Sequence, residues 1–313
     1  MKKKIIAILS LLSLAGIPAK AAKLAVDKVS DQANFVAHVD FETLLKTEVG
    51  KFILAEIKKN PMTQRQLAGI KAAFGVDLEG LGNTVFGRGE PEKGIIFASG
   101  GFNAQQIEGF FALNEKIETS AYKGKTIYHE NRKAFAIVNE DTIIAGSGEE
   151  FVKHGLDVFS GREPSMKKSD LLADLAKAIP YPVAIAIADL KRIAKLNPPK
   201  KAPEAAILKK ARALGVALGE TEGQVRMAAV LKASDEETAQ HLENVMRGGA
   251  SLIALGADLD PKLAELAGTV KTHVAREGLN VRFYLGVSAD LMKEKMAEEM
   301  AKENSASATA EDE

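Results

Sequence analysis

The sequence predicts an α+β fold made of two related halves, each a mainly antiparallel sheet packed with helices. Short apolar runs separated by polar turns indicate strands that pair as hairpins. Helical patterns fall between the hairpins rather than after every strand, which favours an α+β layer over a parallel doubly wound sheet. The order of elements at 34–163 recurs at 180–302, which indicates an internal duplication.

A strand that leads directly into a helix occurs once in each half. In the first copy, at 94–113, an apolar run precedes Asn103, whose side chain suits the capping position of a helix. In the second copy, at 224–253, Ser234 and Glu237 have the spacing of a capping box. Alternate strand residues point to opposite faces, so one face of the second strand should be internal. The expected internal residues are Val225, Met227, Ala229 and Leu231, and the expected external residues are Arg226 and Lys232.

The remaining elements follow from the same patterns. Helices within 42–74 should break at Asn60-Pro61, since proline disfavours helix in the residue before it. The first half should also contain strands at 34–40, 83–87, 94–102, 125–129, 134–139 and 142–145, and a helix at 149–159. The second half should contain strands at 182–190, 214–218, 224–232, 269–276 and 279–287, and a helix at 290–302; the strand at 142–145 has no clear counterpart there.

These patterns divide the chain into segments. Residues 1–21 are interpreted as a signal peptide, 22–33 as a polar lead-in, 34–163 as the first repeat and 180–302 as the second. A helix that opens at Ser169 occupies the connecting segment 164–179. The last segment, 303–313, is mostly serine, alanine and acid without an apolar face, so we expect it to be disordered.

The N-terminus has the three parts of a secretory signal. Three lysines at 2–4 precede an apolar run at 5–17, and Ala19-Lys20-Ala21 has the form of a cleavage site. The apolar run is shorter than the roughly 20 residues of an ordinary membrane span. Cleavage after Ala21 would remove four lysines and no acids, which leaves 38 basic and 42 acidic residues and a formal net charge of −4. We therefore expect an exported protein, periplasmic or extracellular, without a transmembrane span in the mature chain.

Composition excludes several kinds of chemistry. The chain has 313 residues and no cysteine, so disulfides, thiolate metal sites and cysteine nucleophiles are excluded. Lysine plus arginine and aspartate plus glutamate both number 42, so the overall charge gives no argument for nucleic acid. The 46% apolar content allows most of the chain to pack around a core.

Three segments carry a resemblance to a known class. They are Val39-Asp40 with Leu44-Leu45 and Gly50, the run Tyr122–Tyr128, and Ile143–Glu150 leading into a helix. On these segments the chain resembles a class of secreted bacterial two-repeat α+β proteins whose domain has no assigned function. The resemblance covers most of the mature chain. It implies a fold and a compartment, and it assigns no functional residue.

Candidate catalytic and metal-binding patterns have simpler structural interpretations. Gly146-Ser147-Gly148 lacks the third glycine of a dinucleotide fingerprint, so we interpret it as a tight turn before a helix. The pairs Asp40/Glu42 and Asp258/Asp260 stand at strand–helix joints, where aspartate caps helices. The five histidines show no close metal-binding spacing; they are His38, His129, His154, His241 and His273. We therefore predict no catalytic, cofactor-binding or metal-ligating residues, and no cofactor.

One segment is unusually basic. Between 191 and 212 the only acid is Glu204, and three prolines interrupt the run. This pattern is typical of a solvated linker and helix face, but it also suits a patch that binds an anionic envelope polymer. The basic residues are Lys191, Arg192, Lys195, Lys200, Lys201, Lys209, Lys210 and Arg212.

The sequence favours an exported, non-catalytic envelope protein that binds a partner, either an envelope protein or an anionic polymer. Two alternatives stay open. One is an exported hydrolase whose active-site residues are dispersed along the chain. The other is a carrier that holds an apolar ligand between its sheet and its helices. No pattern indicates binding of nucleic acid.

Overall fold

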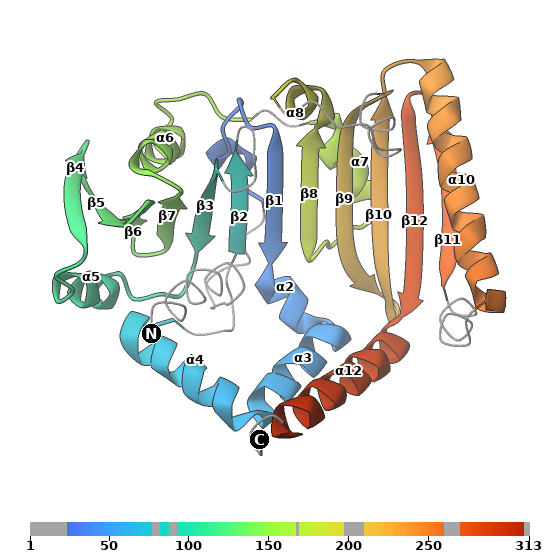
Figure 1. Cartoon of the computed structure of the whole chain (residues 1–313). Helices are drawn as coiled ribbons and strands as arrows, with labels where there is room; N and C mark the ends of the chain where they lie inside the picture. The colour runs from blue at the N-terminus through green and yellow to red at the C-terminus, as the bar shows by residue number, and fades with distance from the viewer. Residues whose placement is uncertain are drawn as a thin grey trace.

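The computed structural model describes residues 24–76, 82–87, 93–166, 169–196, 210–259 and 270–309. Twelve strands form one antiparallel sheet in the order β11-β12-β10-β9-β8-β1-β2-β3-β7-β6-β5-β4. Figure 1 shows this sheet running across the whole molecule, with helices on both of its sides. The predicted α+β class with a mainly antiparallel sheet is therefore confirmed. The predicted signal peptide lies outside the described residues.

The first part of the chain closely follows the predicted order. The structure differs from the predicted order in two places. A third helix precedes β2, because Thr47 caps a new helix. Strand β4 was not predicted, because its half-polar pattern gives no clear signal. The elements are η1 (Val26–Lys28), β1 (Phe35–Asp40), α2 (Phe41–Lys46), α3 (Glu48–Lys59), α4 (Pro61–Phe74), β2 (Gly82–Gly87), β3 (Gly94–Ser99), α5 (Ala104–Ala112), β4 (Glu118–Tyr122), β5 (Lys125–Glu130), β6 (Lys133–Asn139), β7 (Thr142–Gly146) and α6 (Glu149–Phe159).

The second part begins with the connecting helix, α7. Its last helix continues past the predicted end at 302, because the alanines and serines that follow do not interrupt a helix as glycine or proline would. The elements are α7 (Asp170–Ala178), β8 (Ala184–Asp189), α8 (Leu190–Leu196), β9 (Ala211–Thr221), β10 (Gln224–Ala233), α10 (Glu236–Leu259), β11 (Lys271–Glu277), β12 (Asn280–Ser288) and α12 (Ala289–Thr309). Residues 310–313 lie outside the described part.

Polar side chains begin the helices where the sequence predicts caps, with one exception. Asn103 Oδ1 accepts from the backbone N–H of Gln106 at 3.0 Å, and Ser169 Oγ accepts from that of Leu172 at 3.1 Å. The capping box at Ser234 is wrong. Asp235 caps α10 instead, accepting from the N–H of Thr238 at 2.8 Å, while Ser234 Oγ donates to the carbonyl of Lys210.

One face of the sheet is closed by α6 and α7, and we call it the closed face. Under α6 it carries fully buried side chains such as Phe86, Ile127 and Ile144. Under α7 it carries Ala217, Ala228 and Val230, each fully buried. The main cores of the protein therefore lie between this face and two amphipathic helices.

Glycines bring the sheet and these helices close together. A Cβ on Gly155 of α6 would lie 2.9 Å from Ile144 Cγ2, and one on Gly215 of β9 would lie 2.8 Å from Leu175 Cδ1. Atoms of a packed core do not approach that closely. Glycine at these two positions therefore allows α6 and α7 to pack directly on the strands.

The outer hairpin β4–β5 is fixed to α6 by a buried carboxylate. Asp157 accepts hydrogen bonds from Tyr122 Oη at 2.8 Å, Lys123 Nζ at 2.9 Å and Arg162 Nε at 2.7 Å. Burial opposes its negative charge, but these three donors outweigh burial and lower the pKa of Asp157 to about 2. The hairpin at the edge of the sheet is thus held by charge as well as by backbone pairing.

The predicted orientation of β10 needs correction. Ala228 and Val230 are fully buried under α7, whereas Met227 and Ala229 point to the opposite face and stay half-buried. The alternation was identified correctly, and Leu231 is buried as predicted, in a cluster with residues of α10. Over the centre of the strand, however, the more deeply buried side is the one that carries Ala228 and Val230. Sequence alternation alone does not reveal which face a distant helix covers.

Candidate functional site

The glycine-rich turn and the carboxylate Asp40, which were candidates for chemistry, have structural roles at helix N-termini. Gly148 ends the turn before α6, and a Cβ there would meet the Glu150 carboxylate at 2.7 Å. Glu149 and Glu150 occupy the first turn of α6, where they already meet the positive end of the helix and would repel a bound anion. Asp40 caps α2, accepting from the N–H of Thr43 at 2.9 Å, as predicted. Of the other pair, Asp260 lies outside the described residues.

The histidines are spread over the molecule and do not meet one another. His38 lies 2.7 Å from Thr84 Oγ1, and His154 lies 3.1 Å from Ser30 Oγ. His241 contacts Lys210, and the His273 ring stacks at 6.0 Å on Tyr284. Across the described ranges, no three histidine, aspartate or glutamate side chains gather in a way that could hold a metal ion.

The structure brings one serine, one histidine and one glutamate together, a group that the sequence did not indicate. Ser120 Oγ lies 2.8 Å from His129 Nε2 and donates to Glu149 Oε1 at 2.8 Å. In a catalytic triad the carboxylate holds the other imidazole nitrogen, so that the first nitrogen can accept the serine proton. Here the serine hydroxyl donates its hydrogen bond to the carboxylate itself, and a hydrogen bond from Lys153, 2.9 Å away, lowers the pKa of Glu149. The group therefore joins β4, β5 and α6 and is not arranged as a triad.

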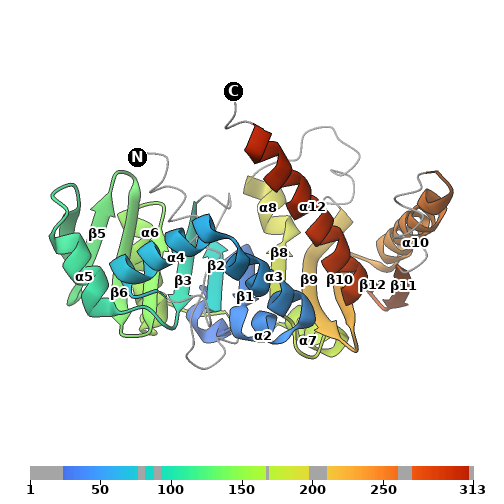
Figure 2. The same cartoon turned by 90° about the horizontal axis from the view of Figure 1, so that it is seen from below.

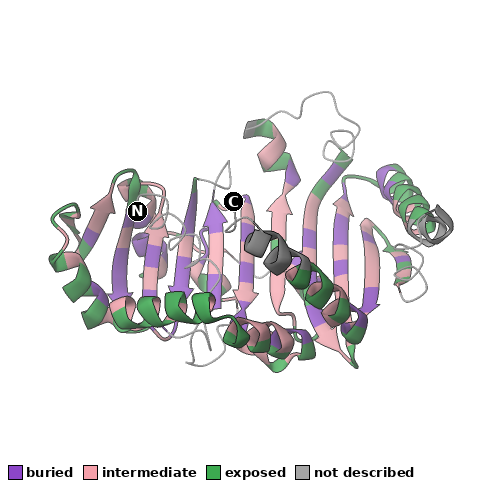
Figure 3. Ribbon diagram, turned by 60° about the horizontal axis from the view of Figure 1, so that its bottom comes forward, coloured by how far each residue is buried: buried purple, intermediate pink, exposed green. Residues whose placement is uncertain are grey.

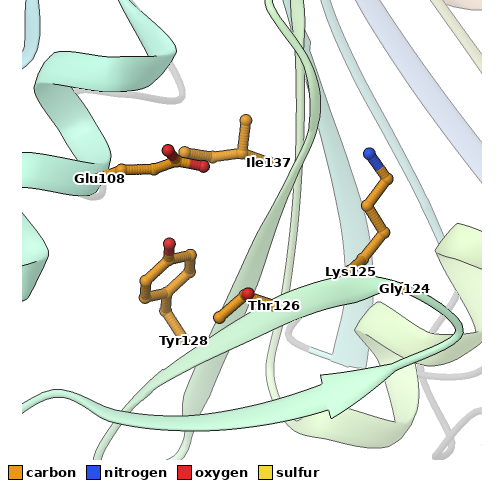
Figure 4. A pocket seen from close by; sticks show the side chains of 6 residues that line it. All are labelled: Glu108, Gly124, Lys125, Thr126, Tyr128 and Ile137. Carbon is orange, nitrogen blue, oxygen red and sulfur yellow. The ribbon is translucent and has the colours of Figure 1, made fainter.

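A small pocket of about 160 Å³ lies between α5 and the β5–β6 hairpin. Figure 4 shows Glu108 and Tyr128 facing each other across it, with the Lys125 ammonium turned away. Lys125 Nζ donates to the carbonyl of Val138, and burial, reinforced by the charge of Glu108, raises the pKa of Tyr128. The pocket is smaller than the roughly 300–1,000 Å³ of typical ligand sites, so it does not offer room for a substrate of ordinary size.

The basic segment is only partly described. Lys200, Lys201 and Lys209 lie outside the described residues. Lys191, Arg192 and Lys195 lie on α8 and Lys210 and Arg212 at the start of β9, all five exposed. Nearby acids reduce their combined charge. Arg192 pairs with Asp189 at 3.5 Å, and Lys210 and Lys191 both help to lower the pKa of Asp235, after its hydrogen bonds from Thr238. The patch thus gathers at one end of β8 and β9.

The most unusual surface is the sheet face opposite α6 and α7, which we call the open face. One row of neighbouring residues crosses seven adjacent strands from β3 to β12 and contains only apolar side chains. Ala186 is exposed, and the other members are half-buried. The row consists of Ile96, Val85, Ala37, Ala186, Val216, Ala229 and Phe283.

The adjoining row on the open face is also apolar over the centre of the sheet. It continues through Val39, Ala184, Leu218, Met227 and Leu285. Leu218 is 38% exposed, although it lies in the middle of a long strand. Contiguous exposed apolar surface of this kind marks binding sites in soluble proteins. In Figure 3 the strands between α8, α10 and α12 carry buried and intermediate residues in turn, since one ribbon carries the residues of both faces.

In the described part of the chain, helices stand around the open face without covering its centre. Figure 2 shows α8 and α12 rising on one side of β8–β10 and α7 on the other. At one end, Ala188 and Leu214 pack against a core cluster that contains Leu190 of α8, and α10 packs on β10, β11 and β12. At the other end, Phe41 of α2 packs on Val39 and Ala98. The open face is therefore bounded at both strand ends and along one side.

The helix α3 is fixed at this boundary by a contact between distant parts of the chain. The Glu220 carboxylate, at the end of β9, accepts from the backbone N–H groups of Glu48 at 2.8 Å and Val49 at 3.1 Å. A carboxylate at a helix N-terminus satisfies free donors and complements the helix dipole. The helix α12 packs on α3 and on β12. These contacts hold two helices beside the open face rather than on it.

The sequence contained a signal for this face that its alternation alone did not resolve. β8 reads Ala-Ile-Ala-Ile-Ala-Asp, so both of its faces are apolar. A strand with one face in water normally alternates apolar with polar residues. The alanine face of β8 therefore indicated an apolar surface that large side chains do not fill and that carries no polar groups to contact water.

No protein-family model and no curated protein matches the chain. Among solved structures, it is similar to three crystal forms of TP0453. Crystal form III aligns with a TM-score of 0.48 and 10% identity over 88% of this chain and 97% of that one. Crystal form IV aligns with a TM-score of 0.48 and 10% identity over 87% of this chain and 95% of that one. Crystal form I aligns with a TM-score of 0.45 and 12% identity over 90% of this chain and 99% of that one. At this level the likeness carries no argument about function.

Proposed function

We propose that the protein is an exported, non-catalytic binding protein that holds an apolar partner or ligand on its open face. The observation that carries the proposal is the uninterrupted apolar row through Ala37, Ala186, Val216, Ala229 and Phe283. Its backbone groups are already paired within the sheet, so the face offers apolar contact rather than hydrogen bonding. Leaving such side chains in water costs about 25 cal/mol per Å², which a bound partner would recover.

Export is part of the proposal and rests on the N-terminal pattern. Lysines at 2–4, the apolar run at 5–17 and the Ala19-Lys20-Ala21 site support cleavage after Ala21. Within the described residues, no helix combines the length and hydropathy that a membrane span requires. Periplasmic or extracellular placement of the mature protein follows from the signal alone.

We also propose that the two parts of the sheet arose by duplication. The strand order β1-β2-β3-β7-β6 is repeated by β8-β9-β10-β12-β11, with β1 and β8 side by side at the centre. In both parts, a helix follows the third strand of this order. The hairpin β4–β5 would then be the element without a counterpart, rather than the strand at 142–145.

A fluorescence experiment tests the binding role. Nile red, an uncharged dye whose emission rises in apolar surroundings, should bind the purified exported protein. Replacing Val216 with Asp places a charge at the centre of the open face and should weaken binding at least about tenfold. The matched control is Ala121→Asp at the outer strand β4, where the side chain is already exposed. Equal binding by the two folded variants, or no binding by the wild type, would contradict the proposal.

A further inference from the structure

A row of small side chains runs along the middle of the open face. β8 places Ala184, Ala186 and Ala188 on this face, and we call these three residues the alanine lane. On the β9 side, their direct neighbours are the longer side chains of Leu218, Val216 and Leu214.

The other side of the lane is formed by β1. Val39 lies beside Ala184, Ala37 beside Ala186 and Phe35 beside Ala188. At Ala184 and Ala188 the alanine side chains are shorter than their neighbours on both β1 and β9. At Ala186 the alanine is shorter than its neighbour on β9 and equal to Ala37 on β1. Because neighbouring strands are about 4.8 Å apart, the depression is about one strand wide.

The lane is long and has no polar group along its length. From Ala184 to Ala188 it measures about 13 Å at about 3.3 Å per residue. Ala186 is exposed, and Ala188 is half-buried at the α8 end, where it packs against the core cluster that contains Leu190. Its side chains and their neighbours on both strands are apolar, from Phe35 and Leu214 at one end to Val39 and Leu218 at the other. A narrow apolar track of this length fits an extended aliphatic chain better than a helix, which is about 10 Å wide.

The two ends of the lane differ in charge. At Asp189, β8 passes directly into α8, whose first turn carries Lys191 and Arg192. Arg212 precedes Ala213, the direct neighbour of Asp189 on β9. These three cations are exposed. The opposite end lies near Glu220, whose carboxylate is occupied by the N-terminus of α3.

The acids near the basic end are already engaged. Asp189 Oδ1 accepts from the backbone N–H of Arg192 at 2.9 Å, and Asp235 Oδ1 accepts from that of Thr238 at 2.8 Å. Each carboxylate caps a helix and complements its dipole. Asp189 also pairs with the Arg192 side chain at 3.5 Å, and Arg192 Nη1 donates to the carbonyl of Asp31 at 3.2 Å. An incoming anion at this end would therefore meet chiefly Lys191 and Arg212.

We propose that the alanine lane binds a single long-chain aliphatic carboxylate, with its chain on Ala184, Ala186 and Ala188 and its carboxylate beside Lys191 and Arg212. This inference rests on the proposed binding role of the open face and names its ligand. Apolar contact along the lane supplies affinity, and the cations determine which end of the ligand lies at α8.

The test uses cis-parinarate, a naturally fluorescent fatty acid, on the purified exported protein. Hexadecanoate should displace it, and octanoate should do so at least roughly tenfold less well, because octanoate does not reach the full length of the lane and each further methylene buried there strengthens binding. Ala186→Phe fills the lane and should weaken binding of hexadecanoate and of hexadecanol at least about tenfold. The matched control, Ala121→Phe, adds the same ring at an exposed position of strand β4 and should change the binding of neither hexadecanoate nor hexadecanol.

The charged end is tested separately. Lys191→Glu combined with Arg212→Glu should weaken hexadecanoate binding roughly fivefold and leave the uncharged hexadecanol unchanged. The same reversal at Lys133, an exposed residue of β6, should have no effect. An equal loss for the acid and the alcohol would overturn the assigned direction of the ligand.

Three outcomes separate this inference from the proposed function. Nile red binding that depends on Val216, without displacement by hexadecanoate, would overturn the fatty acid and leave the binding face in place. Absence of binding by both probes would overturn both. Binding to phospholipid vesicles that Ala186→Phe does not change, with no binding of the monomeric acid, would assign the face to a membrane surface and overturn the lane.

Discussion

The closed and open faces of strand β10 lie back to back, yet they meet different surroundings. Val230 is fully buried beneath α7, while its neighbour Ala229 is half-buried on the open face. Both faces are apolar over the centre of the sheet, so hydrophobicity alone does not distinguish them. What distinguishes them is the covering helix, which comes from another part of the chain. An apolar strand face is therefore a core only where a helix reaches it, and elsewhere it is a candidate binding surface.

The largest expected difference comes from placing a charge on each face of β10. Val230→Asp should lower the free energy of unfolding by about 4 kcal/mol or prevent folding, because it buries an unpaired charge under α7. Ala229→Asp should cost about 1 kcal/mol, because the side chain can reach water. Denaturant unfolding of both variants measures the difference. Similar losses would mean that the open face is covered in solution.

A second pair of variants compares steric room on the two faces. Ala217→Phe on β9 should cost about 3 kcal/mol, because α7 leaves no space above a fully buried alanine. Ala186→Phe on the adjoining strand should change the free energy of unfolding by less than about 0.5 kcal/mol, since Ala186 is exposed. Thermal melts would detect the difference. A large loss for Ala186→Phe would show that the alanine lane is filled by the chain itself.

The third prediction concerns the charged contact that fixes the edge hairpin to the closed face. Hydrogen bonds from Arg162, Lys123 and Tyr122 overcome the effect of burial and lower the pKa of Asp157 to about 2, below the unfolded value of about 3.9. A lowered folded-state pKa stabilises the protein above the unfolded value, and this stability is lost as the pH falls from about 4 to about 2. Asp157→Asn should therefore cost about 2 kcal/mol near neutral pH.

Unfolding curves at several pH values check this sign. The difference between wild type and Asp157→Asn should shrink as the pH falls below about 4. The control is Asp170→Asn, whose carboxylate is 90% exposed and makes one long ion pair of 3.8 Å with Lys232. A difference for Asp157→Asn that persists unchanged at low pH would show that lost packing, rather than lost charge, causes the effect.

Local patterns determined many of the elements. The alternation at 35–40 and 224–233, the break at Asn60-Pro61 and the caps at Asn103 and Ser169 all depend on residues within one or two turns. The sequence therefore predicted the antiparallel pairing, the starts of α4, α5 and α7, and the α+β class. It misjudged the start of α10, because Ser234 and Asp235 are both good capping residues and their local spacing does not decide between them.

The tertiary structure decided which apolar faces are cores and which stay open. The alternation of β8 indicated two apolar faces, but only the position of α6 and α7 leaves Ala186 exposed and buries Val230. The sequence likewise identified the basic residues on α8, but only strand pairing places Arg212 beside the same end of the alanine lane. Such relations join residues far apart in the chain, where short-range periodicity carries no information. The compartment signal and the elements are thus properties of local sequence, whereas the candidate site exists only through long-range packing.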